Sequence, residues 1–238
     1  MALFALSDLH LSLGTDKPMD IFGPSWHNYT DRILSNWTRT VTADDLVIIG
    51  GDLSWATYLD EARADFEFLH SLPGKKLLIK GNHDYWWESV TKLKSFVADS
   101  GFDSIDFLHN SAYIYEDFVI AGTRGWILPS SDDFGAEDEK IYNRELIRLG
   151  LSLDEAVRLM PDTGDFKLTA VLHYPPVLSG GKADKGIMDV LKRYNVTRCI
   201  YGHLHGGGLS TAFSGNSGGI EFTLTSADYL DFTPVQIT

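Results

Sequence analysis

The chain has 238 residues, of which 44% are hydrophobic and 22% are charged, and its formal net charge is −13 at pH 7. This length and apolar content predict a globular protein with a substantial core and exclude a disordered chain. The negative charge disfavours nucleic acid and anionic membrane surfaces as partners. It still allows an anionic substrate, because bound divalent cations would reverse the local field.

Neither a membrane span nor an export signal is predicted. No apolar run approaches the ~20 residues that a span needs. Residues 1–6 are apolar but lack a basic region, and Asp8 and His10 end the run too early for a secretory signal. Cys199 is the only cysteine, so no intramolecular disulfide is possible. These features predict a cytoplasmic protein.

In the first half of the chain, short apolar runs alternate with helical patterns. Strands are predicted over residues 3–7, 47–49 and 77–79. Helices are predicted over residues 30–40, over the stretch from Leu59 to Leu69, and over residues 89–99. Residues 11–26 contain two glycines and two prolines, which predict an irregular loop. This alternation of strands and helices predicts an α/β fold.

The second half begins differently, with three strand-like runs separated by turn residues, at 104–108, 112–115 and 118–121. These runs predict a second sheet built from hairpins. Residues 130–161 are acidic and helical, and we interpret them as a helical insertion, cap or peripheral decoration within a single domain that spans residues 1–238. Later strands are predicted over residues 168–172, 198–201, 220–225 and 235–237, with a helix over 183–194.

Polar side chains follow five of the predicted strands. One apolar run leads into Gly81-Asn82-His83-Asp84, which places an amide, an imidazole and a carboxylate at a strand end. The other four runs end in Asp8 and His10, in Asp52, in His173, and in His203 and His205. In extended backbone, residues two apart face the same side, which predicts that Asp8 and His10 point together. The carboxyl ends of strands are where open α/β sheets bind ligands, and five such coincidences predict a metal site.

This ordered set of motifs resembles the calcineurin-like metallophosphoesterase superfamily. The family pattern is Asp-x-His, Gly-Asp, Gly-Asn-His-Asp/Glu, His and Gly-His-x-His, and the matched positions run from Asp8 to His205. The resemblance implies an α/β (α+β) fold, a four-layer α/β/β/α sandwich of two mixed β-sheets flanked by helices. It also implies a phosphoric ester hydrolase with a dinuclear metal centre.

The resemblance further implies which residues hold the metals. One metal would be held by Asp8, His10 and His205. The second metal would be held by Asn82, His173 and His203. The carboxylate of Asp52 would bridge the two. Mixed oxygen and nitrogen ligands suit manganese, iron or zinc better than calcium.

His83 is the motif histidine that the resemblance leaves without a metal. A hydroxide shared by the two metals would attack phosphorus, and His83 would donate a proton to the leaving oxygen or stabilise charge on it. The neighbouring Asp84 would orient His83 or anchor its loop. Arg124 follows another predicted strand, and it would either contact the substrate phosphate or form a surface salt bridge.

The second motif departs from the protein serine/threonine phosphatase branch of the superfamily, in which it continues into an Asp and an Arg. Here Asp52 is followed by Leu53-Ser54-Trp55-Ala56. This departure argues against a phosphoprotein phosphatase and leaves phosphodiesterases and small-molecule phosphatases open.

Aromatic residues gather beside the motifs, namely Trp55, Tyr85, Trp86, Trp87, Trp126 and Tyr174. Such a cluster either stacks on a nucleobase or packs the loops that carry the metal ligands. We favour packing, because metal ligands need rigid support.

We therefore predict a hydrolase of a small-molecule or nucleotide phosphate ester, with monoesters and diesters both compatible. The acidic surface would repel long polyanions. A nuclease of the same superfamily is the alternative enzyme, but Lys75, Lys76 and Lys80 are too few and too close together for a basic track. A catalytically inactive protein-binding scaffold is a further hypothesis, and the complete set of motif residues argues against it.

Overall fold

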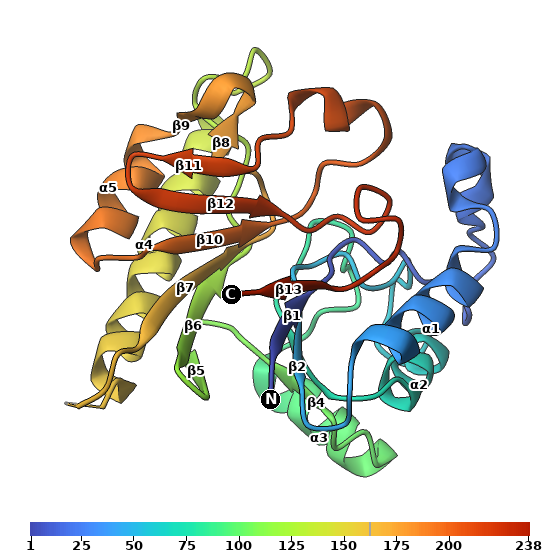
Figure 1. Ribbon diagram of the computed structural model, residues 1–238. Coiled ribbons are helices and arrows are strands. Elements are labelled where there is room, and N and C mark those ends of the chain that lie inside the picture. Colours follow the sequence, from blue (N-terminus) through green and yellow to red (C-terminus); the bar gives the residue numbers. More distant parts are fainter. Residues whose placement is uncertain (162) are drawn as a thin grey trace. The chain divides into compact units, whose positions relative to one another are not determined.

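Largely buried strands form the centre of two mixed sheets. The computed structural model describes residues 1–161 and 163–238. The chain divides into a first unit, Met1–Phe107 with Thr225–Thr238, and a second unit, Leu108–Leu224. Each unit contains one of the two sheets and its own helices (Figure 1). Two mixed sheets flanked by helices confirm the predicted α/β class and are consistent with a calcineurin-like sandwich.

The sheet of the first unit has five strands in the order β13-β1-β2-β3-β4. Their bounds are Leu3–Ala5 for β1, Leu46–Ile49 for β2, Lys75–Leu78 for β3, Ile105–Phe107 for β4 and Val235–Ile237 for β13. The strands β1 to β4 are parallel to one another, and β13 is antiparallel to β1. The parallel arrangement brings the carboxyl ends of β1, β2 and β3 to one edge of the sheet.

Three α-helices and two short 3-10 helices complete the first unit. Their bounds are Met19–Phe22 for η1, Pro24–Trp26 for η2, Tyr29–Thr40 for α1, Arg63–Ser71 for α2 and Val90–Ser100 for α3. The apolar faces of the α-helices share one buried cluster with the sheet, in which Trp37 and Phe66 lie with Val47 and Ile49. This cluster explains the helical periodicity of the sequence, because one stripe of each helix is buried.

The sheet of the second unit has six strands in the order β11-β12-β10-β7-β6-β5. Their bounds are Ala112–Tyr115 for β5, Phe118–Thr123 for β6, Lys167–Leu172 for β7, Arg198–Tyr201 for β10, Gly215–Ser217 for β11 and Ile220–Leu224 for β12. The four central strands are parallel, and each edge strand is antiparallel to its neighbour. A small separate hairpin joins β8 (Val177–Leu178) to β9 (Lys182–Ala183).

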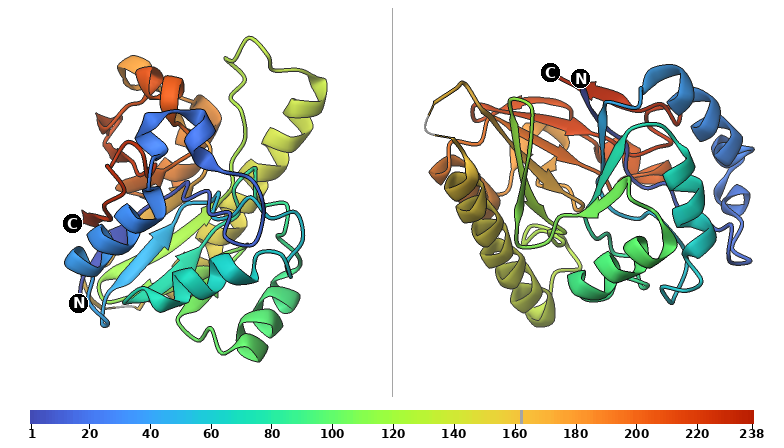
Figure 2. Two further views of the ribbon diagram at one scale, coloured as in Figure 1. Left: turned by 90° about the vertical axis from the view of Figure 1, so that its right-hand side faces the viewer. Right: turned by 90° about the horizontal axis from the view of Figure 1, so that it is seen from below.

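The helices of the second unit are α4 (Ala136–Leu159) and α5 (Lys185–Arg193), with short 3-10 helices η3 (Ser179–Gly181) and η4 (Gly206–Thr211). The long helix α4 lies alongside β5 and β6 (Figure 2). It buries Leu149, Leu153 and Ala156 in the core of the unit. The acidic segment at residues 130–161 therefore contributes a helix that covers the second sheet.

Two local predictions differ from the structure. The run at residues 104–108 was predicted to form hairpins with the two runs after it, but β4 instead pairs in parallel with β3 in the first sheet. Only β5 and β6 form the hairpin. Tertiary packing decides this difference, because a strand of only three residues, Ile-Asp-Phe, fits either sheet. The predicted loop at residues 11–26 contains the two 3-10 helices η1 and η2.

Candidate metal and catalytic site

Asp8, His10 and Asp52 converge at the carboxyl ends of β1 and β2. Each offers one ligand atom, and these atoms lie within 4.8 Å of one another. The His10 Nε2 lies 3.8 Å from the Asp52 Oδ2. All three side chains are buried. Two carboxylates and an imidazole are oxygen and nitrogen donors of the kind that first-row divalent metals prefer, so the group fits a metal ion.

The backbone brings these side chains together in a way that the sequence did not indicate. Asp8, His10 and Asp52 have positive φ angles of 58°, 45° and 53°, and His203 in the second unit has 71°. Asp8 and His10 therefore have left-handed backbone conformations and do not lie in the extended backbone that was predicted. Positive φ is uncommon outside glycine, and such conformations cluster at functional sites. The local strain supports a functional role for these residues.

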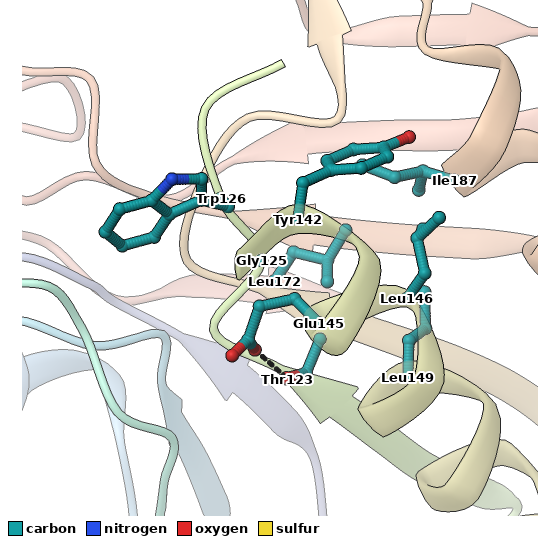
Figure 3. A pocket seen from close by; sticks show the side chains of 9 residues that line it. All are labelled: Thr123, Gly125, Trp126, Tyr142, Glu145, Leu146, Leu149, Leu172 and Ile187. Atoms are coloured by element: carbon teal, nitrogen blue, oxygen red, sulfur yellow. Dashed lines mark hydrogen bonds between the residues drawn. The ribbon is translucent and has the colours of Figure 1, made fainter. Parts of the chain in front are cut away.

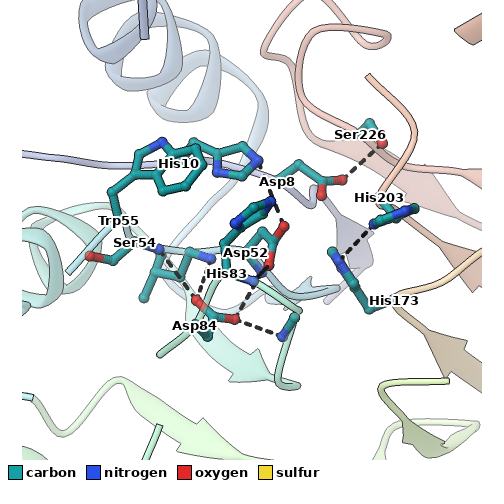
Figure 4. Close-up of polar contacts among 12 residues, drawn as sticks. Asp8, His10, Asp52, Ser54, Trp55, His83, Asp84, His173, His203 and Ser226 are labelled. Atoms are coloured by element: carbon teal, nitrogen blue, oxygen red, sulfur yellow. Dashed lines mark hydrogen bonds and ion pairs between the residues drawn. The ribbon is translucent and has the colours of Figure 1, made fainter. Parts of the chain in front are cut away.

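Asp84 anchors the two loops that follow β2 and β3 (Figure 4). Its Oδ2 accepts the backbone N–H groups of Gly81 at 2.7 Å and of Asp52 at 2.9 Å. Its Oδ1 accepts the backbone N–H of Leu53 at 2.9 Å and the indole N–H of Trp86 at 3.0 Å. The buried carboxylate therefore ties the loop of Asp52 to the loop of Asn82 and His83. Of the two roles considered for Asp84, the structure shows loop anchoring.

The same loop after β2 is held from the other side by Asp65 on α2. The Ser54 hydroxyl donates to this buried carboxylate, and the Leu13 backbone N–H donates to it at 2.7 Å. Burial raises the pKa of Asp65, and the two hydrogen bonds oppose that rise. Asp65 thus links α2 to the loops after β1 and β2, which carry the candidate ligands.

His83 lies beside the candidate metal ligands of the first unit. Its backbone N–H donates to the Asp52 Oδ1 at 2.8 Å. Its ring centroid is 5.6 Å from that of His10 and 4.5 Å from that of Trp55, which stacks on His10 at 4.9 Å (Figure 4). Asn82 immediately precedes His83 and is half-buried. The first unit therefore brings together four of the predicted site residues, namely Asp8, His10, Asp52 and His83, and Asn82 is the sequence neighbour of His83.

A serine far along the chain supports Asp8. Ser226 donates its hydroxyl to the Asp8 Oδ2 at 2.8 Å, and both side chains are buried. Ser7 and Thr225, the residues before them, form a second hydroxyl pair at 2.7 Å. Ser226 was not predicted, because no motif marks a serine 218 positions away from its partner. The hydrogen bond orients the carboxylate of this candidate metal ligand.

The second unit brings together His173 and His203, which follow the neighbouring strands β7 and β10. The His203 Nδ1 lies 3.3 Å from the His173 Nε2 (Figure 4). The ring of Tyr174 lies 4.2 Å from that of His203. His173 is buried, whereas His203 and His205 are half-buried. Two imidazole nitrogens at this separation can coordinate one metal ion, and His205 follows two residues after His203.

Arg124 follows β6 beside His173. Its backbone carbonyl accepts the N–H groups of His173 at 3.0 Å and of Tyr174 at 2.9 Å. Its guanidinium lies 4.4 Å over the ring of Trp126 and 3.8 Å from the buried carboxylate of Glu145. Burial lowers the pKa of Arg124, and Glu145 opposes that change.

Glu145 on α4 belongs to a small pocket that Trp126 and Tyr142 also line (Figure 3). The Thr123 hydroxyl donates to the Glu145 Oε2 at 2.5 Å, and the Arg148 guanidinium lies 2.7 Å from the Oε1. Glu145 therefore accepts a hydrogen bond from Thr123 on β6 and also lies close to the guanidinium of Arg124. This arrangement holds the end of β6, from which the Arg124 loop departs.

The family comparison agrees with this geometry. The strand-end carboxylates and imidazole of Asp8, His10 and Asp52 form a candidate metal site. The family model for calcineurin-like phosphoesterases matches residues 1–207. The chain therefore belongs to the calcineurin-like phosphoesterase family and is a phosphoester hydrolase. No curated protein matches the chain.

Solved structures show the same fold at low sequence identity. Phosphopantetheinyl hydrolase from Mycobacterium tuberculosis is 16% identical, with a TM-score of 0.56, and the alignment covers 99% of this chain and 95% of that one. A protein of unknown function from Aquifex aeolicus is 15% identical, with a TM-score of 0.52 and the same coverage. A protein from Thermus thermophilus is 12% identical, with a TM-score of 0.54, over 99% of this chain and 97% of that one.

Among residues 1–161 and 163–238, no helix combines the length and the apolar character that crossing a membrane requires.

Proposed function

We propose that this phosphoesterase is a dinuclear enzyme that hydrolyses a small-molecule or nucleotide phosphate ester. Asp8, His10 and His205 would hold one metal ion, and Asn82, His173 and His203 the other. Asp52 would bridge the two. The observation that carries the proposal is the convergence of Asp8, His10 and Asp52 within 4.8 Å. The 3.3 Å approach of His203 to His173 supports a second set of ligands.

Metal ions bound by these residues would activate water and neutralise charge on the phosphoryl oxygens. Manganese, iron and zinc all suit the donor set. The chain's own contribution is to hold the ligands rigid, through Asp84, Asp65 and Ser226, and to supply a proton donor.

His83 is the proposed proton donor. Its ring lies 5.6 Å from that of His10, so it is close to the candidate ligands. Its backbone is held by the Asp52 carboxylate. In the proposed reaction the bond between phosphorus and the leaving oxygen breaks, and that oxygen takes a proton from His83.

Arg124 is proposed to contact the substrate phosphate. A guanidinium can donate two hydrogen bonds to phosphate, and Arg124 keeps a loose 3.8 Å ion pair to Glu145. The competing interpretation, a purely structural ion pair, predicts that Arg124→Gln weakens folding. The phosphate role predicts that Arg124→Gln raises KM for the ester while the protein stays folded.

The substrate is proposed to be small. Lys76 is buried, so it adds nothing to a basic track and the nuclease alternative is weakened further. A phosphopantetheinyl hydrolase among the structural neighbours is in keeping with a small-molecule ester. A cytoplasmic location is part of the same proposal, since the single cysteine, Cys199, is buried and free.

Metal analysis combined with two chromogenic esters tests the proposal. The purified protein is expected to bind close to two equivalents of manganese or iron, and then to release nitrophenol from p-nitrophenyl phosphate or bis(p-nitrophenyl) phosphate. His83→Ala should keep both metals and lose most activity, whereas Asp52→Asn should lose metal as well. Metal binding without turnover of either ester would instead favour the scaffold hypothesis. Loss of metal in His83→Ala would reassign that residue as a ligand.

A further inference from the structure

Trp55 lies against both histidines at the end of the first sheet. Its ring is 4.9 Å from His10 at an interplanar angle of 26°, and 4.5 Å from His83 at 52°. Trp55 is half-buried, so part of the indole reaches solvent. Any organic group attached to an oxygen that His83 protonates must therefore lie close to this indole.

Two exposed aromatic side chains extend from the same place. Phe22 is 58% exposed and lies parallel to Trp55, with ring centroids 6.2 Å apart and an interplanar angle of 9°. Tyr85 is 63% exposed and meets the ring of His83 edge-on at 6.3 Å. We refer to Phe22, Trp55 and Tyr85 as the aromatic platform.

Packing explains the neighbouring tryptophans, and Trp55 also packs against the core, but packing does not explain the two exposed rings of the platform. Trp86 is buried, donates to Asp84 and packs against Phe66 at 5.1 Å. Trp87 packs against Phe107 at 5.4 Å. These two residues have the loop-packing role that the sequence favoured. Phe22 and Tyr85 keep more than half of their surface in water, and grouped exposed apolar side chains are typical of binding sites.

Trp55 is held in position against η1. The indole N–H of Trp55 donates to the Met19 Sδ at 2.9 Å, and Met19 is buried in η1, the helix that also carries Phe22. The Lys17 ammonium donates to the Trp55 carbonyl at 2.9 Å and lies 5.9 Å from the indole centroid. Two segments far apart in sequence thus hold Phe22 and Trp55 parallel. Because the two rings are already ordered, binding a ligand costs little further conformational entropy.

We propose that the aromatic platform binds the leaving group of the substrate, and that this group is a flat aromatic or heteroaromatic ring. The inference rests on the proposed function, because it takes His83 as the donor to the leaving oxygen. Stacking on the rings of Trp55 and Phe22 stabilises a bound flat apolar group, whereas a short alkyl group gains little binding energy from these rings. Aryl and heteroaryl phosphate esters are therefore the preferred substrate class.

Non-hydrolysable phosphonates test the platform without catalysis. Calorimetry on the manganese-loaded protein is expected to show that phenylphosphonate binds more tightly than methylphosphonate, and that Phe22→Ala lowers this preference by about three- to tenfold. Ile21→Ala is the matched control, since Ile21 is the exposed neighbour of Phe22 in η1. It should leave the preference unchanged.

Hydrolysis gives the second readout. Phenyl phosphate and ethyl phosphate are compared by kcat/KM, or diphenyl and diethyl phosphate if diesters are the substrates. Because these leaving groups differ in intrinsic reactivity, the informative quantity is the change in the aryl-to-alkyl ratio between the wild type and Phe22→Ala. A roughly threefold to tenfold fall is expected, with no change in Ile21→Ala.

The outcomes separate the two proposals. Hydrolysis with an aryl-to-alkyl ratio that Phe22→Ala does not change overturns the platform and leaves the hydrolase standing. An aryl preference in phosphonate binding that Phe22→Ala removes, without hydrolysis of any ester, supports the platform and overturns the proposed catalytic role. Equal binding of the two phosphonates by the wild type refutes the platform.

Discussion

The carboxylate of Asp84 accepts the backbone N–H of Asp52 at 2.9 Å, so Asp84 positions the residue that we propose as the bridging metal ligand. Each carboxylate oxygen of Asp84 accepts at least two N–H donors. The residue is a buried junction between two loops.

Asp84→Asn is expected to lower the free energy of unfolding by about 2–4 kcal/mol. In either orientation of the new amide, its NH2 group replaces a carboxylate oxygen that accepted two N–H donors. The NH2 group cannot accept those hydrogen bonds. Chemical denaturation measures the loss, and metal titration should show weaker binding. Asp106→Asn, at a half-exposed carboxylate of the same unit, is the control and should change stability by less than about 0.5 kcal/mol. Equal stability of the two variants would contradict the anchoring role.

Ser226→Ala removes the hydroxyl that donates to the Asp8 Oδ2. Metal affinity is expected to fall about tenfold, because an unsupported carboxylate orients less well toward a cation. Stability should fall by only about 1 kcal/mol. Competition with a metal-sensitive dye measures the affinity. The control is Ser71→Ala, whose hydroxyl is exposed and donates to the Phe68 carbonyl; an equal loss of affinity in both variants would show that Ser226 has no special role.

Gly81→Ala is expected to destabilise the protein and to weaken metal binding. A Cβ at this position would lie 2.0 Å from the Asp52 Oδ1 and 2.3 Å from the Asp52 backbone nitrogen. Such overpacking typically costs about 1–3 kcal/mol. By contrast, Gly150→Ala on α4 meets nothing within 4 Å and should stabilise the helix by about 0.5–1 kcal/mol. Thermal unfolding of the two variants measures both changes in stability. An increase in the stability of Gly81→Ala would contradict the close approach of residue 81 to Asp52.

Lys76 predicts a pH dependence of stability. Burial lowers the pKa of its ammonium from 10.5 to about 8, although the group donates to the Leu72 carbonyl at the end of α2. The unfolded chain therefore binds this proton more tightly than the folded protein does, so the contribution of Lys76 to stability rises from about pH 8 to about pH 10.5. Below this range both states are protonated, and the cost of burying the charge is fully present.

Lys76→Met should remove that rise. Denaturation at several pH values from about 7 to about 10.5 measures the difference in unfolding free energy between the wild type and Lys76→Met. As the pH rises over this range, the difference should change in favour of the wild type by up to about 3 kcal/mol. The adjacent Lys75→Met variant, at an exposed lysine, is the control. A pH-independent difference for Lys76→Met would refute the lowered pKa.

The sequence by itself determined most of the strands, the α-helices and the residues that follow the strand ends. Apolar periodicity and strand-end motifs are local patterns, so they are visible without coordinates. The motif from Gly81 to Asp84 predicted a functional strand end, and the family match over residues 1–207 agrees with it.

Tertiary structure alone decided which residues support the site. Ser226 contacts Asp8 across 218 positions, Phe22 stacks on Trp55, and β4 pairs with β3 and not with the hairpin that follows. The positive φ angles at Asp8 and Asp52 were likewise invisible in the sequence. The physical reason is common to all four. Their energies come from contacts between segments remote along the chain, or from backbone strain that such contacts maintain, and neither leaves a periodic pattern in the residues themselves.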